Sequence, residues 1–506
     1  MLLASKKAAA FALFISVSAQ SFSQKNTVTI LPSDTPTDVV RKAANVVPSE
    51  RQLRWQQLEV TGFFHFGINT FTNREWGDGK EDPKLFIPEK LDAKQWVRTA
   101  KEAGIKQVIL TAKHHDGFCL WPTKTTSHSV QSSPWKKGKG DVVKEVSEAC
   151  KEYNIGFGIY LSPWDRNAAL YGTDAYNDFF VAQLTELLTN YGRIDEVWFD
   201  GANGEGPNGK KQVYDFERWY QVIRKLQPSA TIAVMGPDIR WVGTETGYGR
   251  EQEWSVVPVN NINPADIGAL SQQAVAFKPQ GDMMGSDLGS RDKIMNAKGL
   301  AWYPAETDVS IRPGWFYHEE EDSKVKSPQK LLDIYLKSVG HNGVLLLNIP
   351  PDKNGLISTS DLKSLQGWKV LRDSLFANNV GKGASVQSAN GKDGAALLDG
   401  KLKTFFTTKG KDTTTTITLH LSSPKTFDVL LLQENIALGQ RIEKFSLLAL
   451  EGKQWKKIGE GTTVGYKRLL QVEPVTTTAV RLVIESSRLN PNLAEFGLYK
   501  FPDNAK

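Results

Sequence analysis

The sequence predicts an α/β protein, an irregular (β/α)8-like TIM barrel followed by an all-β sandwich domain. Three observations lead to this prediction. Apolar strand-like runs alternate with helical patterns from about residue 58 to 355. The stretch 237–298 interrupts them, because it is polar, rich in Gly and Asp, and without a long amphipathic helix. After residue 380, short β-rich segments alternate with turns, as in an antiparallel sandwich.

The first 24 residues have the features of a secretory signal peptide. Lys6 and Lys7 precede an apolar run from Ala8 to about Val17, which is too short to span a membrane, and small residues at 17–19 suit cleavage. We therefore expect export to the periplasm or the extracellular space, with a buried N-terminal helix as the alternative. No later stretch approaches 18 apolar residues, so no membrane span is expected.

An N-terminal segment at 25–54 precedes the barrel, which is expected over 55–358. Its strands are continuous apolar runs, which suit strands covered on both faces. The expected strands are 60–67, 106–114, 155–163, 196–201, 231–236, 300–306 and 344–350. The expected helices are 91–104, 141–154, 176–192 and 327–343. Asp141 is the expected cap of the second helix, and Ser327 followed by proline is the expected start of the last.

A linking helix is expected over 359–380, and the sandwich over 381–506. The sandwich prediction depends on apolar segments in which helical periodicity is gone. These segments are 415–421, 426–434, 443–450, 479–485 and 495–500.

Composition excludes several classes of function. The chain has 62 basic and 56 acidic side chains, and a net charge of +6 without a basic run does not indicate a nucleic-acid-binding protein. Its two cysteines, Cys119 and Cys150, are too few for a disulfide framework or a cysteine-based zinc site. Two buried free thiols are expected, with a single bridge between them as the alternative.

Side chains that can do chemistry follow the barrel strands. In a barrel of this type the active site lies at the carboxyl ends of the strands. The residues found there are His65, His114, His115, Tyr160, Trp164, Trp198, Asp200, Glu306 and Asp308. Imidazole donates to and accepts from hydroxyls, and aromatic faces pack on the C–H faces of sugars, so the group favours a carbohydrate site.

A catalytic metal is not expected. His114 and His115 are neighbours within a predicted strand, so their side chains should point to opposite faces and not share an ion. Glycoside hydrolysis instead requires two carboxyl groups. Asp200, which closes an apolar strand just before Gly201, is the first candidate. Position alone leaves the second open among Glu245, Glu253 and Glu306.

Five separated motifs resemble the glycoside hydrolase family of retaining exo-α-L-fucosidases. They are FFHFGINTFTNREWGDG, LTAKHHDGFCLWPTKTTSHSV, IYLSPWD, EVWFDGANG and ETDVSIRPGWFYH, in that order over about 55–355. The resemblance implies an irregular barrel, an α-L-fucosidase activity and no catalytic cofactor or metal. It makes Asp200 the nucleophile. It also implies a fucose pocket lined by His65, His114, His115, Tyr160 and Trp198, to which Glu75 and Trp315 are expected to contribute.

The tract RWVGTE, residues 240–245, resembles the subfamily that acts on α-1,3 and α-1,4 fucosyl linkages in branched, Lewis-type glycans. It selects Glu245 as the acid/base and leaves Glu306 as a structural or outer-subsite carboxylate. Trp241 and Trp254 are candidates to pack on a second sugar. Two alternatives remain open, a broad-specificity fucosidase that also takes α-1,2 linkages and a catalytically inactive secreted fucose-binding protein.

The C-terminal segment resembles a discoidin-like, galactose-binding-like sandwich. The resemblance depends on ALLDGKLKTFFTT at 396–408, AVRLVIE and NLAEFGLYKF at 492–501. Such modules often bind sugar or a structural calcium ion, so a calcium site in this domain is left open. The expected partners are fucosylated oligosaccharides or glycoconjugates.

Overall fold

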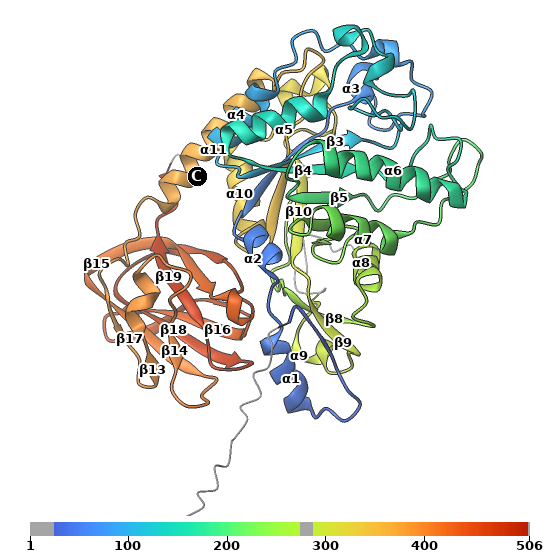
Figure 1. Ribbon diagram of the computed structural model, residues 1–506. Coiled ribbons are helices and arrows are strands. Elements are labelled where there is room, and N and C mark those ends of the chain that lie inside the picture. Colours follow the sequence, from blue (N-terminus) through green and yellow to red (C-terminus); the bar gives the residue numbers. More distant parts are fainter. Residues whose placement is uncertain (1–24, 274–286, 504–506) are drawn as a thin grey trace, which may run out of the picture.

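The computed structural model describes residues 25–273 and 287–503, and the expected signal peptide lies outside them. Eight parallel strands form a nearly closed barrel in the order β6-β5-β4-β3-β2-β11-β10-β7 (Figure 1). These strands are β2 (Val60–Phe64), β3 (Gln107–Lys113), β4 (Gly156–Leu161), β5 (Glu196–Phe199), β6 (Thr231–Val234), β7 (Arg240–Trp241), β10 (Ala305–Ser310) and β11 (Val344–Asn348). The predicted TIM-like barrel is confirmed.

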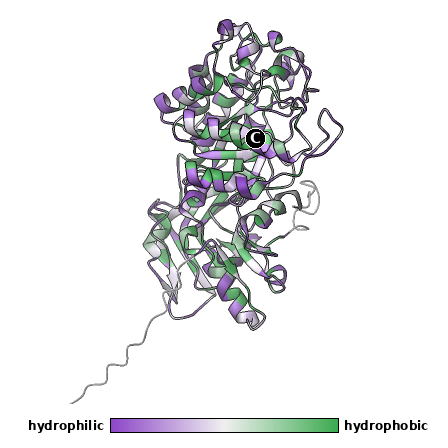
Figure 2. Cartoon of the chain, turned by 45° about the vertical axis from the view of Figure 1, so that its right-hand side comes forward, coloured by the Kyte–Doolittle hydropathy of each residue, from purple (hydrophilic) through white to green (hydrophobic). Residues whose placement is uncertain are grey.

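Helices surround the barrel, and many carry both hydrophilic and hydrophobic residues, as expected of helices with one face on the sheet (Figure 2). The longer ones are α4 (Ala93–Glu102), α5 (Val142–Tyr153), α6 (Asp174–Asn190), α7 (Phe216–Leu226) and α10 (Pro328–Ser338). The predicted caps are present, since Asp141 accepts from the backbone of Lys144 and Ser327 from that of Lys330. The helices that precede α4 in the chain are α1 (Pro36–Asn45), α2 (Glu50–Gln56) and α3 (Ile68–Thr72).

The stretch 237–298 is irregular, as predicted. Besides β7 it holds β8 (Val256–Val259), the ten-residue α8 (Pro264–Gln273) and the four-residue α9 (Arg291–Ile294). The prediction of one barrel strand at 300–306 is wrong. Residues Gly299–Trp302 form β9 in a separate three-stranded sheet with β8 and β1 (Thr27–Thr29), and the barrel strand β10 starts at Ala305. Pro304, which has no N–H for a ladder, lies between the two.

The C-terminal domain is an antiparallel sheet structure joined to the barrel by α11 (Thr359–Phe376), and Figure 1 shows it in orange and red beside the barrel. Its strands are β12 (Ser385–Gln387), β13 (Gly391–Lys392), β14 (Thr407–Thr408), β15 (Thr415–Glu434), β16 (Ile442–Glu451), β17 (Gln454–Gly461), β18 (Arg468–Ser487) and β19 (Leu493–Tyr499). The two strands predicted within 415–434 form one strand, β15, whose register shifts between His420 and Lys425.

The direction of the barrel strands determines where the candidate site lies. The strands are parallel, so their carboxyl ends meet at one edge, and the side chains that follow them converge there. Cys119 and Cys150 are buried free thiols in this core, as expected. Among residues 25–273 and 287–503, none of the helices combines the length and the apolar character that crossing a bilayer requires.

Candidate active site

Asp200 lies at the mouth of the barrel, directly after β5. Its side chain is about a quarter exposed (26%). The Tyr160 hydroxyl donates to Oδ2 at 3.1 Å, and the backbone N–H of Ala202 donates to Oδ1 at 2.7 Å. His115 Nε2 lies 3.9 Å from Oδ2. These groups hold one carboxylate in a fixed orientation while leaving it open to solvent.

His114 and His115 both contribute to the site. The expectation that they point to opposite faces is wrong, because β3 ends at Lys113 and both lie in the following turn. Their ring centroids are 4.1 Å apart. His114 stacks on Tyr160, with centroids 5.8 Å apart, and His115 Nδ1 contacts Ser162 Oγ at 2.7 Å. Burial lowers the pKa of both rings, so at neutral pH they are neutral groups that can bind hydroxyls.

His65 follows β2 and lies on the same wall of the site. Its ring centroid is 6.1 Å from that of Tyr160 and 5.1 Å from that of Trp315. Burial lowers its pKa to about 3. Trp198 stacks on Tyr160 from within the barrel, with centroids 5.2 Å apart. A continuous aromatic wall therefore runs from Asp200 to Trp315.

Glu245 lies at the other end of this wall, on the loop after β7. Its side chain is exposed at the rim, and Trp315 Nε1 donates to its Oε2 at 3.3 Å. Surrounding protein raises the pKa of Glu245, and the nearby charges of Asp200 and Glu75 raise it further. A raised pKa keeps a fraction of this carboxyl protonated, as a general acid requires.

Glu75 holds the loop that carries Trp315. Its Oε2 accepts from the backbone N–H of Trp315 at 2.8 Å, and its Oε1 from that of Phe316 at 3.2 Å. His318 Nε2 also lies 2.6 Å from Oε1. The structure therefore shows Glu75 as a support for the Trp315 loop.

The other two candidate acids are buried. Glu253 forms ion pairs with Arg240 and Arg250 and is 1% exposed. Glu306 is fully buried and accepts from Trp198 Nε1 at 2.8 Å. The outer-subsite role suggested for Glu306 is wrong, because its carboxyl lies inside the barrel beneath Trp198.

The two tryptophans considered for a second sugar differ. Trp241 is half-buried at the mouth, and its Nε1 donates to Asp308 at 2.8 Å. Trp254 is 2% exposed, and the guanidinium of Arg488 from the C-terminal domain lies over its ring at 3.9 Å. The expectation for Trp254 is therefore wrong, because its ring is buried between the two domains.

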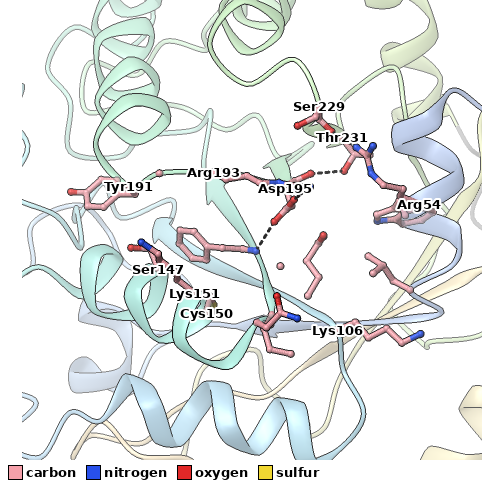
Figure 3. Close-up of a pocket in the computed structure, with 18 of the residues that line it drawn as sticks. Arg54, Lys106, Ser147, Cys150, Lys151, Tyr191, Arg193, Asp195, Ser229 and Thr231 are labelled. Atoms are coloured by element: carbon pink, nitrogen blue, oxygen red, sulfur yellow. Dashed lines mark hydrogen bonds and ion pairs between the residues drawn. The ribbon is translucent and has the colours of Figure 1, made fainter.

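A cavity of about 740 Å³ lies at the opposite end of the barrel (Figure 3). It is lined by residues near the starts of strands, including Lys106, Asp195 and Thr231. Its position separates it from Asp200, which follows the end of β5. This cavity is therefore not the site at the barrel mouth, despite its size.

Metal-binding groups are sparse. Within the described ranges no cluster of three or more His, Cys, Asp or Glu side chains could hold an ion. The C-terminal domain does bring two carboxylates and a hydroxyl together. Thr404 Oγ1 donates to Asp399, and burial together with the charge of Asp399 raises the pKa of Glu495 to about 7. Glu495 Oε1 is buried without a hydrogen-bond partner. Two carboxylates and one hydroxyl are oxygen donors of the kind that calcium prefers, but they supply only part of the six to eight ligands that the ion takes.

The sequence reasoning missed three residues at the site. Ser162 contacts His115, and Trp76, although 57% exposed, packs edge-on against His115 and Trp164. Asn348, the last residue of β11, contacts His65 at 2.9 Å. A polar residue closing the apolar run VLLLN is a signal that could have identified Asn348.

The arrangement suits cleavage of a glycosidic bond. Asp200 and Glu245 offer two carboxyl groups at one mouth, and neutral imidazoles and aromatic rings lie between them. Carboxyl pairs of this kind provide the nucleophile or base and the acid of glycoside hydrolysis.

Comparisons with known proteins agree with this chemistry. A family model described as Alpha-L-fucosidase matches residues 53–368, and one described as F5/8 type C domain matches residues 382–496. Alpha-L-fucosidase 1 of Arabidopsis thaliana is 42% identical over 90% of this chain and 87% of its own length.

Solved structures show the same likeness. A putative alpha-L-fucosidase from Bacteroides ovatus has 50% sequence identity and a TM-score of 0.82, and the match covers 94% of this chain and 78% of that one. A Ruminococcus gnavus GH29 fucosidase in complex with fucose has 29% identity and a TM-score of 0.79, with 91% and 96% of the two chains covered.

Proposed function

Since the chain belongs to the alpha-L-fucosidase family, we propose that it removes terminal α-1,3- and α-1,4-linked L-fucose from branched, Lewis-type glycans with retention of configuration. It is an α-L-fucosidase, a glycoside hydrolase. The observation that carries the finer proposal is the single wall of side chains that joins Asp200 to Glu245 at the barrel mouth.

The proposed reaction has two steps. Asp200 attacks the anomeric carbon of fucose, and the bond to the leaving oxygen breaks as protonated Glu245 gives that oxygen its proton. Deprotonated Glu245 then takes a proton from water, whose oxygen displaces Asp200 and releases fucose. The hydrogen bonds from Tyr160 and Ala202 to Asp200, and the raised pKa of Glu245, support this division of roles.

The proposed fucose pocket lies between the two carboxyl groups. His65, His114 and His115 would bind sugar hydroxyls as neutral rings, and Tyr160 would orient Asp200. Trp198 would support the Tyr160 ring from within the barrel. Glu75 would act through Trp315, whose indole contacts both His65 and Glu245.

Replacing Asp200 tests the nucleophile. Asp200→Ala should lower kcat by several orders of magnitude without unfolding the protein, because the side chain is part exposed at a strand end. Azide should restore some turnover of an activated aryl fucoside and give a fucosyl azide of inverted configuration. Near-wild-type release of fucose by Asp200→Ala would remove the assignment. An inactive wild-type enzyme would instead favour the alternative of a secreted fucose-binding protein.

The linkage preference depends on the rim around Glu245. We propose that Trp315 and the half-buried Trp241 contact the sugar that carries the fucose, and their bonds to Glu245 and Asp308 at the rim support this. That contact would hold the acid-bearing loop in its working geometry, so losing the second sugar lowers kcat as well as affinity. The test compares kcat/KM for a Lewis trisaccharide, 2′-fucosyllactose and p-nitrophenyl fucoside. A preference for the aryl fucoside, or equal rates on the α-1,2 linkage, would indicate the broad-specificity alternative.

We further propose a structural calcium ion in the C-terminal domain, held by Asp399, Glu495 and the Thr404 hydroxyl. The buried Glu495 Oε1 without a partner supports this site. Calcium should raise the Tm of the wild type after treatment with a chelator, and should not raise that of Glu495→Gln. An unchanged wild-type Tm would contradict the site.

We also propose that residues 1–24 direct export to the periplasm or the extracellular space. The basic residues before a short apolar run support this. N-terminal sequencing of the protein recovered outside the cytoplasm should find a start between residues 20 and 25. Recovery of uncleaved protein from the cytoplasm alone would contradict it.

A further inference from the structure

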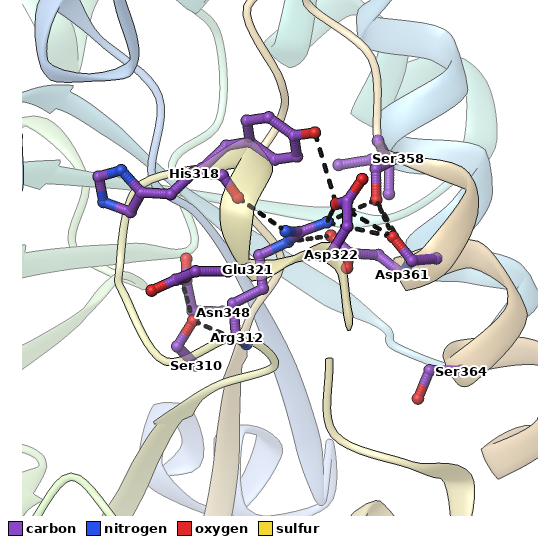
Figure 4. A network of polar contacts seen from close by, with 12 residues as sticks. Ser310, Arg312, His318, Glu321, Asp322, Asn348, Ser358, Asp361 and Ser364 are labelled. Carbon is purple, nitrogen blue, oxygen red and sulfur yellow. Dashed lines mark hydrogen bonds and ion pairs between the residues drawn. The ribbon is translucent and has the colours of Figure 1, made fainter. Parts of the chain in front are cut away.

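Asn348 bonds to two neighbouring parts of the site, the His65 strand end and the Trp315 loop. It is the last residue of β11 and is fully buried. Its Oδ1 lies 3.3 Å from the backbone nitrogen of His65 and 2.9 Å from His65 Nδ1. Its Nδ2 lies 2.8 Å from the carbonyl oxygen of Trp315 and 2.9 Å from Ser310 Oγ (Figure 4). One amide therefore contacts His65, which is proposed to bind the sugar, and the Trp315 loop, which reaches Glu245.

The backbone contacts allow only one orientation of this amide. The backbone N–H of His65 can only donate, so the atom that faces it must be the oxygen. The carbonyl of Trp315 can only accept, so the atom that faces it must be the nitrogen. The assignment of Oδ1 and Nδ2 therefore follows from hydrogen-bond chemistry.

This orientation determines where His65 carries its proton. An amide oxygen only accepts, so the contact of 2.9 Å requires a proton on Nδ1. Burial keeps the ring neutral, so Nε2 then carries a lone pair. No residue that the structure describes forms a hydrogen bond with Nε2. The ring therefore offers one acceptor on its other edge.

The same amide braces the Trp315 loop. Ser310 Oγ, which accepts from Asn348, donates to the carbonyl of Gly314 at 2.6 Å. Asn348 itself donates to the carbonyl of Trp315, whose indole contacts Glu245. Figure 4 shows Ser310 and Asn348 beside the buried Arg312 network.

We propose that Asn348 is a positioning residue that holds His65 as the Nδ1–H tautomer, so that Nε2 accepts a hydrogen bond from a fucose hydroxyl. Through its other end it fixes the loop that places Trp315 against Glu245. The inference relies on the proposed role of His65 in binding fucose, but the tautomer itself can be measured without any sugar.

Two substitutions separate the two ends of the amide. Asn348→Asp keeps an acceptor for His65 and loses the donor to Trp315. Asn348→Leu loses both and leaves the backbone groups of His65 and Trp315 unpaired. Asn492→Asp is the matched control, because Asn492 is equally buried but bonds only to backbone carbonyls within the C-terminal domain.

The experiment is ¹⁵N NMR of the full chain with labelled histidine, recorded with and without fucose, with His65→Gln used to assign the ring. We expect the Nδ1–H tautomer in the wild type and in Asn348→Asp, and its loss in Asn348→Leu. KM should rise about tenfold in Asn348→Leu, as for one lost hydrogen bond. In Asn348→Asp the main change should be a lower kcat on unactivated fucosides. The control Asn492→Asp should leave the His65 tautomer, KM and kcat unchanged.

The outcomes are distinguishable. A wild-type His65 with its proton on Nε2, or an Asn348→Leu enzyme that keeps both the tautomer and the wild-type KM, would overturn the inference. If Asn348→Leu does not fold, the wild-type tautomer and the kcat of Asn348→Asp decide it. If the ¹⁵N signal of wild-type His65 does not change when fucose is added, the result would count against the proposed fucose pocket instead.

Discussion

Two carboxyl groups at the barrel mouth differ in what surrounds them. Asp200 accepts from the hydroxyl of Tyr160 and from the backbone N–H of Ala202, and both donors fix its orientation. Glu245 accepts a single bond from Trp315, and its pKa is raised because the surrounding protein displaces part of its water and because the charge of Asp200 lies nearby. A carboxylate in a fixed orientation suits a nucleophile, and a carboxyl group with a raised pKa suits an acid.

Glu245→Gln should slow unactivated fucosides by about 10²–10⁴-fold and aryl fucosides much less, because acid assistance matters most for a basic leaving oxygen. The acid must be protonated to act, so the wild-type activity falls as pH rises through the pKa of Glu245. This alkaline limb should be absent in Glu245→Gln. Profiles of kcat/KM against pH on both substrate types check the prediction. Glu306→Gln is the comparison. If Glu306→Gln loses the alkaline limb and slows unactivated fucosides while Glu245→Gln does not, the acid is misassigned.

The sequence identified the residue types at the strand ends but not their neighbours. Asp200 and the histidines were found because polar groups after apolar strands stand out. The strand end at Lys113, which turns His114 and His115 to the same site, depends on tertiary pairing. Trp254 could not be excluded from the rim, because its burial depends on Arg488, more than 200 residues away in the sequence.

At the scale of elements, a buried network holds the loop after β10. Arg312 is fully buried and bonds to Asp361 at 3.1 Å, to Ser358 at 2.7 Å and to Asp322 at 2.6 Å (Figure 4). It also donates to the carbonyl of His318. The arginine thereby ties the Trp315 loop to the start of α11.

Arg312→Ala should lower the free energy of unfolding by about 3–5 kcal/mol, because it leaves the buried Asp361 without a counter-charge. Arg312→Lys should recover only part of this, since an ammonium cannot reproduce the planar fork. Denaturant unfolding measures both. Lys369→Ala, which breaks an ion pair on the outside of α11, is the control. An equal loss in the control would show that burial is not the cause.

A second element-scale feature is a pair of carboxyl groups inside the barrel. Burial raises the pKa of Glu306 to about 7, and burial together with Glu306 raises that of Glu196 well above its usual range. Between pH 4.5 and about 7 the folded chain therefore binds more protons than the unfolded chain. Stability from these groups falls as pH rises through that window.

Glu306→Gln should accordingly flatten the dependence of Tm on pH. Glutamine keeps an acceptor for Trp198 Nε1 and cannot ionise, so the drop in Tm between about pH 5 and pH 8 should be smaller than in the wild type. Thermal melts across this range provide the measurement. Glu148→Gln, at an exposed position, should leave the curve unchanged. A steeper drop in Glu306→Gln would contradict the assignment.

The fold was predictable where burial is continuous. Barrel strands covered on both faces appear in the sequence as apolar runs, and helix caps appear as Asp or Ser. The division of 299–310 into β9 and β10 was missed because the apolar run at 300–305 crosses from one strand into the next, and the two strands differ only in their partners. Strand β17 was missed because it is largely exposed and carries polar residues.

At the scale of the whole molecule, the C-terminal domain packs against the irregular stretch 237–298 of the barrel domain. Gln440 is fully buried, accepts from the backbone of Ser255 at 2.8 Å and donates to the carbonyl of Glu253 at 3.2 Å. Arg488 lies over Trp254 and bonds to the carbonyl of Gly289. The sandwich therefore holds the segment that follows the Glu245 loop.

This interface predicts that both domains unfold in one calorimetric transition. Gln440→Ala should lower the free energy of unfolding by about 1–3 kcal/mol, because it leaves buried backbone groups unpaired. It should also lower kcat, since the Glu245 loop loses support. Gln387→Ala, at an exposed edge contact with His420, is the control for calorimetry and activity. Two resolved transitions in the wild type would contradict the coupling.

The two buried thiols allow opening of the barrel to be followed by cysteine alkylation. Cys119 and Cys150 lie in the barrel core, and burial raises the pKa of both, so the folded chain presents almost no thiolate to an alkylating reagent. A maleimide dye can reach Cys119 only when the barrel opens, whereas Cys150 also lines the cavity of Figure 3. The labelling rate of Cys119 therefore reports on opening of the catalytic domain alone, because the sandwich contains no cysteine. Stabilising ligands at the mouth should slow that labelling without touching either sulfur.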